Sequence, residues 1–282
     1  MEKNKTKQRD FYIGWQDRAP APFARTGLRL TLVLALVLPL VAAGLVLTQR
    51  GFADSVFEFG QLREIEGWLV LDPVPQLKIL ASDVADERPA VKSILLLGFG
   101  KRGAEADIER WRAEHGDALF KRPVRLRGTL LYHDGKTLLE LSEGPAAWVA
   151  WAETSSPWQP RREVIGEVKL RGEIYDPKCA FGVMKPGHGK PHRSCAIRCI
   201  SGGIPPVLCI RDEGGQANYL LLLDRAGQRL HQRVLPYVGD QIQVCGQLVR
   251  QDDWLYLYTD PNQDLLRLQP HWMEGDLRMC AE

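Results

Sequence analysis

Cysteine is absent from the chain before Cys179, and all six cysteines lie from that residue onward. The sequence also lacks paired carboxylates, a Ser-His-Asp spacing and a phosphate-binding loop, so we favour a protein without enzymatic activity. Segment 98–103 has G-x-G-x-x-G spacing. A dinucleotide site needs a parallel second strand with an acid at its end, whereas the next strand here runs into a hairpin turn at 133–135, so we interpret the segment as a turn. The net charge of +2 predicts no particular partner, and we expect no nucleic acid among the partners.

Charged residues are also absent between Leu30 and Gln49, where nearly every residue is apolar. A helix of about 20 such residues crosses the hydrocarbon core of a membrane, and Pro39 is tolerated in such a helix. The sequence therefore predicts one transmembrane helix over 30–49. A cleaved signal peptide ending near Ala53 is the competing interpretation, which the long polar region before the apolar run disfavours.

Basic residues outnumber acidic residues before this span. The basic residues are Lys3, Lys5, Lys7, Arg9, Arg18, Arg25 and Arg29, against Glu2, Asp10 and Asp17. The positive-inside rule then places segment 1–29 in the cytoplasm. In a bacterium, the single-pass protein would lie in the inner membrane with everything after the span in the periplasm.

An internal repeat organises the exported part. IEGWLVLDP from Ile65 matches LRGEIYDP from Leu170, and SILLLG from Ser93 matches YLLLLD from Tyr219. A third match joins the segments that begin at Val124 and Ile242, pairing Gly128 with Gly246 and Asp134 with Asp252. Two copies of one small β domain are predicted.

Each copy divides into five strands separated by Gly, Pro and Asp. In the first copy we expect strands near 62–71, 75–80, 92–98, 122–132 and 137–143, with a helix from Ala104 between the third and fourth. In the second copy we expect strands near 164–175, 206–211, 218–224, 241–250 and 254–259. This order resembles that of an OB-fold. The predicted fold class is all-β, with one transmembrane helix followed by two tandem OB-fold-like five-stranded barrels.

The expected boundaries follow from these elements. They are 58–143 for the first barrel, 144–162 for a tryptophan-containing linker packed against one barrel, 163–268 for the second barrel with an insertion at 178–205, and 269–282 for a C-terminal tail. The first copy has no cysteine, so we expect it to be structural or to bind a partner.

The insertion follows the first strand of the second copy, in a loop that OB-folds commonly use for ligands. A helix from Pro191 to the glycines at 202–203 would place His192, Cys195 and Cys199 on one face. The Gly-rich segment 182–189 can fold Cys179 back over that face. Met184 and His188 are further candidate ligands.

Several interpretations of this cluster stay open. One is a disulfide plus a buried thiol, as expected in an oxidising compartment. Another is a zinc site of the Cys₃His type. A third is copper, because thiolates select Cu(I). Cys195-x-x-x-Cys199 resembles the C-x-x-x-C of copper chaperones for cytochrome oxidase and of the dinuclear copper site of oxidase subunit II. Those families place a histidine downstream of the pair, whereas the histidine here is upstream. Haem, without a Cys-x-x-Cys-His, and an iron-sulfur cluster, without a twin-arginine signal, are less favoured.

Two of the three cysteines outside the insertion lie in the second barrel and carry weaker signals. Cys209 and Cys245 lie in predicted strands, where a buried small hydrophobe is the usual role and a disulfide is the alternative.

Within the insertion, Lys178, Arg193 and Arg198 adjoin the cysteines, so we expect nearby cations to lower the thiol pKa values. The alternative is a solvated basic surface, since the helical neighbours of buried ligands usually point outward.

Two resemblances concern the whole chain. A membrane anchor with a periplasmic OB barrel resembles the haem chaperone of cytochrome c maturation in architecture. The pattern F-Y-x-G-W from Phe11, the anchor, and D-P-x-C…H-x-x-C-x-x-x-C…G-G-I-P-P resembles a group of bacterial membrane-anchored proteins that brings no established activity.

The leading functional hypothesis is a membrane-anchored metal-binding or redox accessory protein that works with a membrane-complex partner. The alternative is an assembly module whose barrels hold a partner complex while the cysteines form structural disulfides.

Overall fold

The computed structural model describes residues 20–49, 55–81, 90–153 and 158–268. They fall into two compact units, Met1–Ala53 and Asp54–Glu282. The predicted cytoplasmic segment before residue 20 and the predicted tail 269–282 lie outside the described residues, as does Phe11 of the N-terminal pattern.

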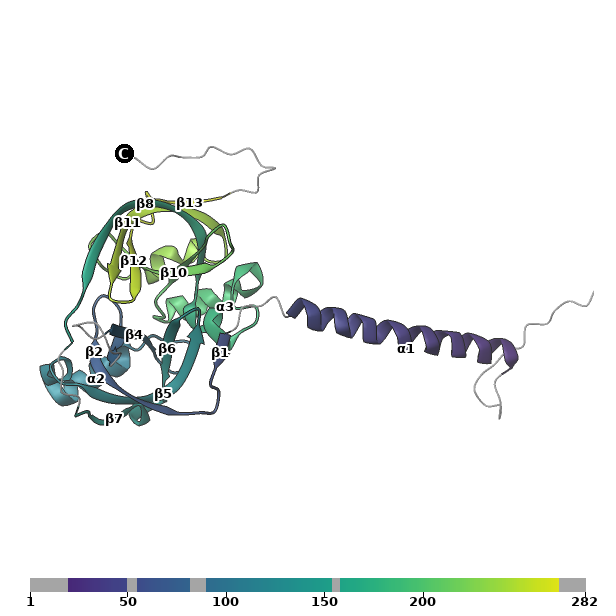
Figure 1. Ribbon diagram of the computed structural model, residues 1–282, viewed down its shortest axis with the longest axis horizontal. Helices are drawn as coiled ribbons and strands as arrows, with labels where there is room; N and C mark the ends of the chain where they lie inside the picture. Colours follow the sequence, from purple (N-terminus) through teal and green to yellow (C-terminus); the bar gives the residue numbers. More distant parts are fainter. Residues whose placement is uncertain (1–19, 50–54, 82–89, 154–157, 269–282) are drawn as a thin grey trace, which may run out of the picture. The chain divides into compact units, whose positions relative to one another are not determined.

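The first unit contains one helix, α1 (Ala21–Gln49), drawn at the purple end of the ribbon in Figure 1. It continues through Pro39 and starts nine residues before the predicted span of 30–49. The earlier start has a local cause, because Pro22 stands in the first turn, where a proline suits a helix, and the Pro20 carbonyl accepts the amides of Phe23 and Ala24. From Ala21 to Leu47 the helix is long and apolar enough to cross a membrane.

The first barrel closes through five strands. They are β2 (Arg63–Val70), β3 (Gln76–Ala81), β4 (Ala90–Leu97), β5 (Val124–His133) and β6 (Lys136–Leu141). The order is β5-β2-β3-β4-β6, and β6 pairs back onto β5. The β4–β6 pairing is parallel and the others are antiparallel.

The second barrel repeats this topology. Its strands are β8 (Arg162–Tyr175), β9 (Val207–Arg211), β10 (Ala217–Leu223), β11 (Gln241–Gln251) and β12 (Trp254–Tyr258). They follow the order β12-β10-β9-β8-β11, β12 closes onto β11, and β10–β12 is again the parallel pair. Figure 1 shows the first barrel in blue to teal and the second in teal-green to yellow. The prediction of two tandem OB-fold-like barrels is confirmed.

Shorter elements complete each barrel. Strands β1 (Ser55–Phe57) and β7 (Trp148–Trp151) pair with β5, so part of the predicted linker extends the first sheet. The predicted helix is α2 (Glu105–His115), followed by η1 (Gly116–Phe120), with η2 (Gly144–Ala147) before β7. The second barrel has the short helices α4 (His231–Val234) and η4 (Leu235–Tyr237) at the position of α2, and β13 (Leu265–Arg267) on β11.

The glycine pair of the repeat has a steric origin. A Cβ at Gly128 would lie 2.2 Å from the Glu140 carbonyl oxygen, and one at Gly246 would lie 2.2 Å from the Tyr258 carbonyl oxygen. Only glycine lets the fourth strand come this close to the fifth. The repeated glycine therefore reflects the close pairing of the fourth and fifth strands that closes each barrel.

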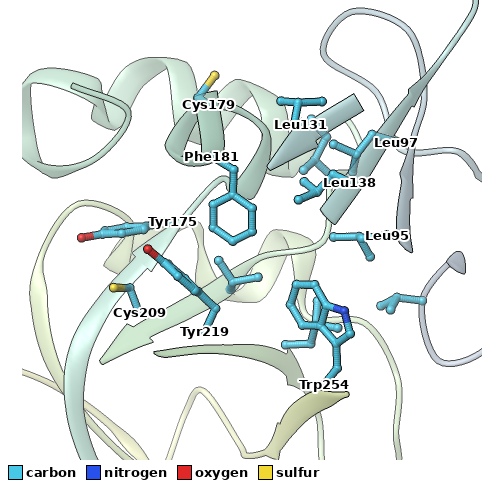
Figure 2. Close-up of a cluster of buried hydrophobic side chains, with 14 of the residues drawn as sticks. Leu95, Leu97, Leu131, Leu138, Tyr175, Cys179, Phe181, Cys209, Tyr219 and Trp254 are labelled. Atoms are coloured by element: carbon cyan, nitrogen blue, oxygen red, sulfur yellow. The ribbon is translucent and has the colours of Figure 1, made fainter. Parts of the chain in front are cut away.

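The two barrels pack against each other through a shared apolar core. Leucines of the first barrel meet Phe181, Tyr219 and Trp254 of the second in one buried cluster, as Figure 2 shows. The first barrel contributes Leu95, Leu97, Leu131 and Leu138 to this cluster. Each barrel also has an apolar cluster of its own. The shared cluster makes the interface part of the folded core.

Two polar contacts between the barrels come from equivalent turns. Asp252, in the β11–β12 turn, pairs with Lys78 of β3 at 2.9 Å. Asp134, in the β5–β6 turn, accepts a hydrogen bond from the Tyr219 hydroxyl at 3.3 Å. Asp134 and Asp252 also share positive φ values of 44° and 53°, a conformation that aspartate tolerates better than most residues. The turn between the last two strands of each barrel thus contacts the other barrel.

Candidate metal centre

The insertion between β8 and β9 forms two helical segments, η3 (Cys179–Val183) and α3 (Gly189–Ser201). Helix α3 begins two residues before the predicted Pro191 and ends, as predicted, before Gly202. The Gly189 amide at its first turn donates to the Glu173 carboxylate at 2.6 Å. A carboxylate stabilises a helix N-terminus, which explains the earlier start.

The ligand atoms converge in two groups. Cys179, His192 and Cys195 each offer one atom within 4.8 Å of the others, and so do Asp176, Cys179 and Cys199. The predicted i, i+3, i+7 spacing on α3 does bring His192, Cys195 and Cys199 to the side that Cys179 faces. Asp176 was not among the predicted ligands, although the D-P-x-C motif contains it.

Most of this cluster is buried. Relative exposure is 0% for Asp176, 4% for Cys179, 4% for His192 and 1% for Cys199, while Cys195 is half-buried. Within the part of the chain that the structure describes, His192 Nε2 and Asp176 Oδ2 are buried polar atoms without a hydrogen-bond partner. A buried polar atom left unpaired is costly, and imidazole nitrogen, carboxylate oxygen and thiolate sulfur are the usual zinc ligands. The Cys/His cluster can therefore hold a metal ion.

The three cysteines of the insertion are free thiols, and so is Cys209. The Sγ atoms of Cys179 and Cys195 are 4.0 Å apart, whereas a disulfide bond is about 2.05 Å long. The alternative in which these cysteines form a structural disulfide is therefore wrong for this structure. Cys245, by contrast, is disulfide-bonded.

The electrostatics of Cys179 differ from the prediction. Its thiol pKa is raised, first by a hydrogen bond with Cys199, then by burial and by the nearby Asp176 carboxylate. The expectation that basic neighbours lower the thiol pKa is wrong for this cysteine. A metal ion must displace the Cys179 proton, so binding here releases a proton. Burial lowers the pKa of His192, which keeps the imidazole neutral and able to bind metal at pH 7.

The basic residues within the insertion are turned away from the cysteines. Lys178 pairs with Glu140 and the Gly100 carbonyl, Arg193 pairs with Asp240 at 3.2 Å, and Arg198 is exposed. The cation at the cluster is Lys101 of the first barrel, whose Nζ lies 3.4 Å from Cys195 Sγ. That hydrogen bond raises the pKa of Lys101. Sequence reasoning missed Lys101, because it lies in the other barrel.

The two reserve ligands lie outside both groups. Met184 is 46% exposed. His188 stacks on Tyr175, with ring centroids 5.3 Å apart, and burial lowers its pKa. Neither side chain belongs to the groups that share Cys179, so the ligand positions of Met184 and His188 stay predictions.

The glycine-rich segment 98–103 is a turn, as interpreted. An isolated bridge joins Leu97 to Gly103, and the Gly103 amide donates to the Gly202 carbonyl at 3.0 Å. A Cβ at Gly202 would lie 2.0 Å from the Lys101 carbonyl oxygen. The close approach of these two backbones carries Lys101 to the cysteines.

Replacing Gly202 with alanine tests this contact between the barrels. Gly202 has φ of −80°, so alanine is compatible with the backbone conformation, and the clash with the Lys101 carbonyl oxygen at 2.0 Å outweighs the contact with the Arg198 carbonyl oxygen at 3.2 Å. We expect a loss of about 1–3 kcal/mol in the free energy of unfolding, measured by chemical denaturation of the full chain in detergent. Gly214→Ala is the matched control, because its Cβ would meet only the Asp212 side chain, at 3.3 Å. Equal stability of both variants would contradict the close packing of the turn on α3.

No family model matches this chain, and no curated protein matches it. The resemblance of its motif to bacterial membrane-anchored proteins stays a prediction. The geometry of the cluster is therefore the basis for inferring the function.

Proposed function

We propose that this chain is a membrane-anchored, periplasmic metal-binding accessory protein that holds zinc or copper through Cys179, Cys195, Cys199 and His192. The observation that carries the proposal is the convergence of three free, mostly buried cysteines with two buried polar atoms that have no hydrogen-bond partner among the described residues. Thiolates suit zinc and Cu(I) alike.

The anchor supplies the proposed location. Helix α1 is an apolar candidate membrane span, and basic residues dominate the sequence before residue 30. By the positive-inside rule, the barrels after the span would face the periplasm of a bacterium.

The position of the cluster suits an accessory role. Lys101 reaches Cys195 from the first barrel, and Lys178 of the insertion pairs with Glu140 of the first barrel. A metal ion in the cluster would stabilise a region that both barrels contribute to, since ligand binding to the folded state raises stability. A membrane-complex partner would then meet a more rigid pair of barrels.

Elemental analysis of the purified full chain in detergent tests the proposal. The protein is produced with zinc and copper in the medium and purified anaerobically. We expect near-stoichiometric metal in the wild type and a large loss in Cys195→Ser. Cys209→Ser is the matched control, because Cys209 is also a buried free thiol of the second barrel but lies outside both ligand groups; it should retain the metal. Metal-free wild type with all the free thiols open to alkylation would refute the proposal.

A further inference from the structure

The candidate ligands of the insertion do not form one compact set. The ligand atoms of Cys179, His192 and Cys195 lie within 4.8 Å of one another, and so do those of Asp176, Cys179 and Cys199. The two groups share Cys179, but the five atoms do not form one group at this limit. Zinc–sulfur bonds are about 2.3 Å long, so two ligands of one zinc ion lie at most about 4.6 Å apart. As they stand, the five atoms fit around two ions better than around one.

Each group has its own unsatisfied polar atom. His192 Nε2 belongs to a residue of the first group and Asp176 Oδ2 to a residue of the second, and neither has a hydrogen-bond partner in the described ranges of the chain. Both residues are more than nine-tenths buried. One metal ion bound in either group would leave the unpaired atom of the other group unexplained.

The ligand types favour zinc in both positions. A carboxylate oxygen is an ordinary zinc ligand, whereas Cu(I) selects thiolates and thioethers. Each group supplies three protein ligands, a number that leaves a tetrahedral zinc ion one open position. Three thiolates and one carboxylate together carry four negative charges. Two divalent ions neutralise this buried charge, whereas one ion leaves half of it uncompensated.

Resting on the proposed function, we infer that the insertion holds two zinc ions bridged by the Cys179 thiolate. His192 and Cys195 complete one position, and Asp176 and Cys199 complete the other. Cys179 is the first residue of η3, which follows β8, while His192, Cys195 and Cys199 come from α3. The bridge therefore ties the turn after β8 to the helix.

Zinc stoichiometry of the full chain in detergent provides the test. Wild-type protein is loaded with zinc under reducing conditions, freed of loosely bound ions and measured by elemental analysis. We expect two ions per chain in the wild type and one each in Asp176→Asn and His192→Gln. Cys179→Ser should lose both ions, and circular dichroism checks that its barrels remain folded. Titration with Co²⁺, followed by the thiolate-to-cobalt absorption, should saturate at two equivalents.

The outcomes separate this inference from the proposed function. One zinc ion in the wild type, lost equally in Asp176→Asn and His192→Gln, would show a single-ion site, which overturns the inference and leaves the proposed function standing. In a parallel titration, tight Cu(I) binding that is unchanged in Asp176→Asn, together with a failure to bind zinc, would overturn the inference in favour of a copper site. No binding of any of the three metals would overturn both.

Discussion

Replacing Asp252 with asparagine is expected to lower the free energy of unfolding by about 3–5 kcal/mol, the usual cost of leaving one member of a buried ion pair uncompensated. The side chains of Asp252 and Lys78 are both fully buried, and their charged atoms lie 2.9 Å apart. Burial lowers the pKa of Lys78, and the carboxylate of Asp252 opposes that shift. Asparagine keeps the shape of the turn residue and its tolerance of positive φ, so the lost charge is the main change.

The repeat supplies the control for this variant. Asp134 occupies the equivalent turn of the first barrel with a similar φ of 44°, but its side chain is 38% exposed. Asp134→Asn should therefore change the stability by less than about 1 kcal/mol. Denaturant unfolding of the full chain, followed by tryptophan fluorescence, measures both variants.

A double variant separates the ion pair from other effects of the turn. Without Asp252, the hydrogen-bonding partner left to the Lys78 ammonium is the Ser93 hydroxyl at 2.8 Å. Lys78→Met removes the uncompensated charge, so Lys78→Met/Asp252→Asn should be more stable than Asp252→Asn alone. A double variant that is no more stable would attribute the loss to the backbone of the turn.

The barrels were predictable because their signals are local. Gly128 and Gly246 recur in the same place, since each permits the same close pairing of two strands. The shared face of His192, Cys195 and Cys199 also follows from helical spacing alone. These features depend on neighbours within one barrel or one helix.

The features that the sequence did not reveal depend on contacts between the barrels. Lys78 is a charged residue in a strand. Its side chain is fully buried, and its ammonium group pairs with Asp252 of the other barrel. Lys101 is distant in sequence from Cys195, and its approach requires the docking of segment 98–103 on Gly202. The expectation that basic neighbours lower the thiol pKa of Cys179 is also wrong, because adjacency in sequence does not set the direction of a side chain.

His231 is expected to make the stability of the protein depend on pH. This histidine begins α4 and makes a hydrogen bond with the backbone of Gly203. Burial, and secondarily the charge of Arg229, lowers its pKa from 6.5 to about 4. Its Nε2 atom is buried and has no hydrogen-bond partner within residues 20–49, 55–81, 90–153 and 158–268. The folded state therefore keeps this imidazole neutral where the unfolded chain would protonate it.

The sign of the pH dependence of stability follows from this difference in proton binding between the folded and the unfolded state. Above pH 6.5 His231 is neutral in both states, so its contribution is constant there. Between pH 6.5 and pH 4 the unfolded state binds a proton that the folded state does not, and stability falls as the pH falls. For a shift of this size the loss is about 2 kcal/mol at pH 5 and about 3 kcal/mol at pH 4.

Comparison with His231→Gln isolates this contribution from the other groups that titrate in acid. Burial raises the pKa of Glu105 and that of Glu173, so the absolute pH profile combines terms of opposite sign. Glutamine retains a hydrogen-bond donor near the Gly203 backbone and has no ionisable group. The difference in unfolding free energy between wild type and variant should be flat from pH 8 to pH 7 and should shift by about 2 kcal/mol toward the variant at pH 5. A difference that stays constant down to pH 4 would mean that His231 binds its proton equally well in the folded and the unfolded state.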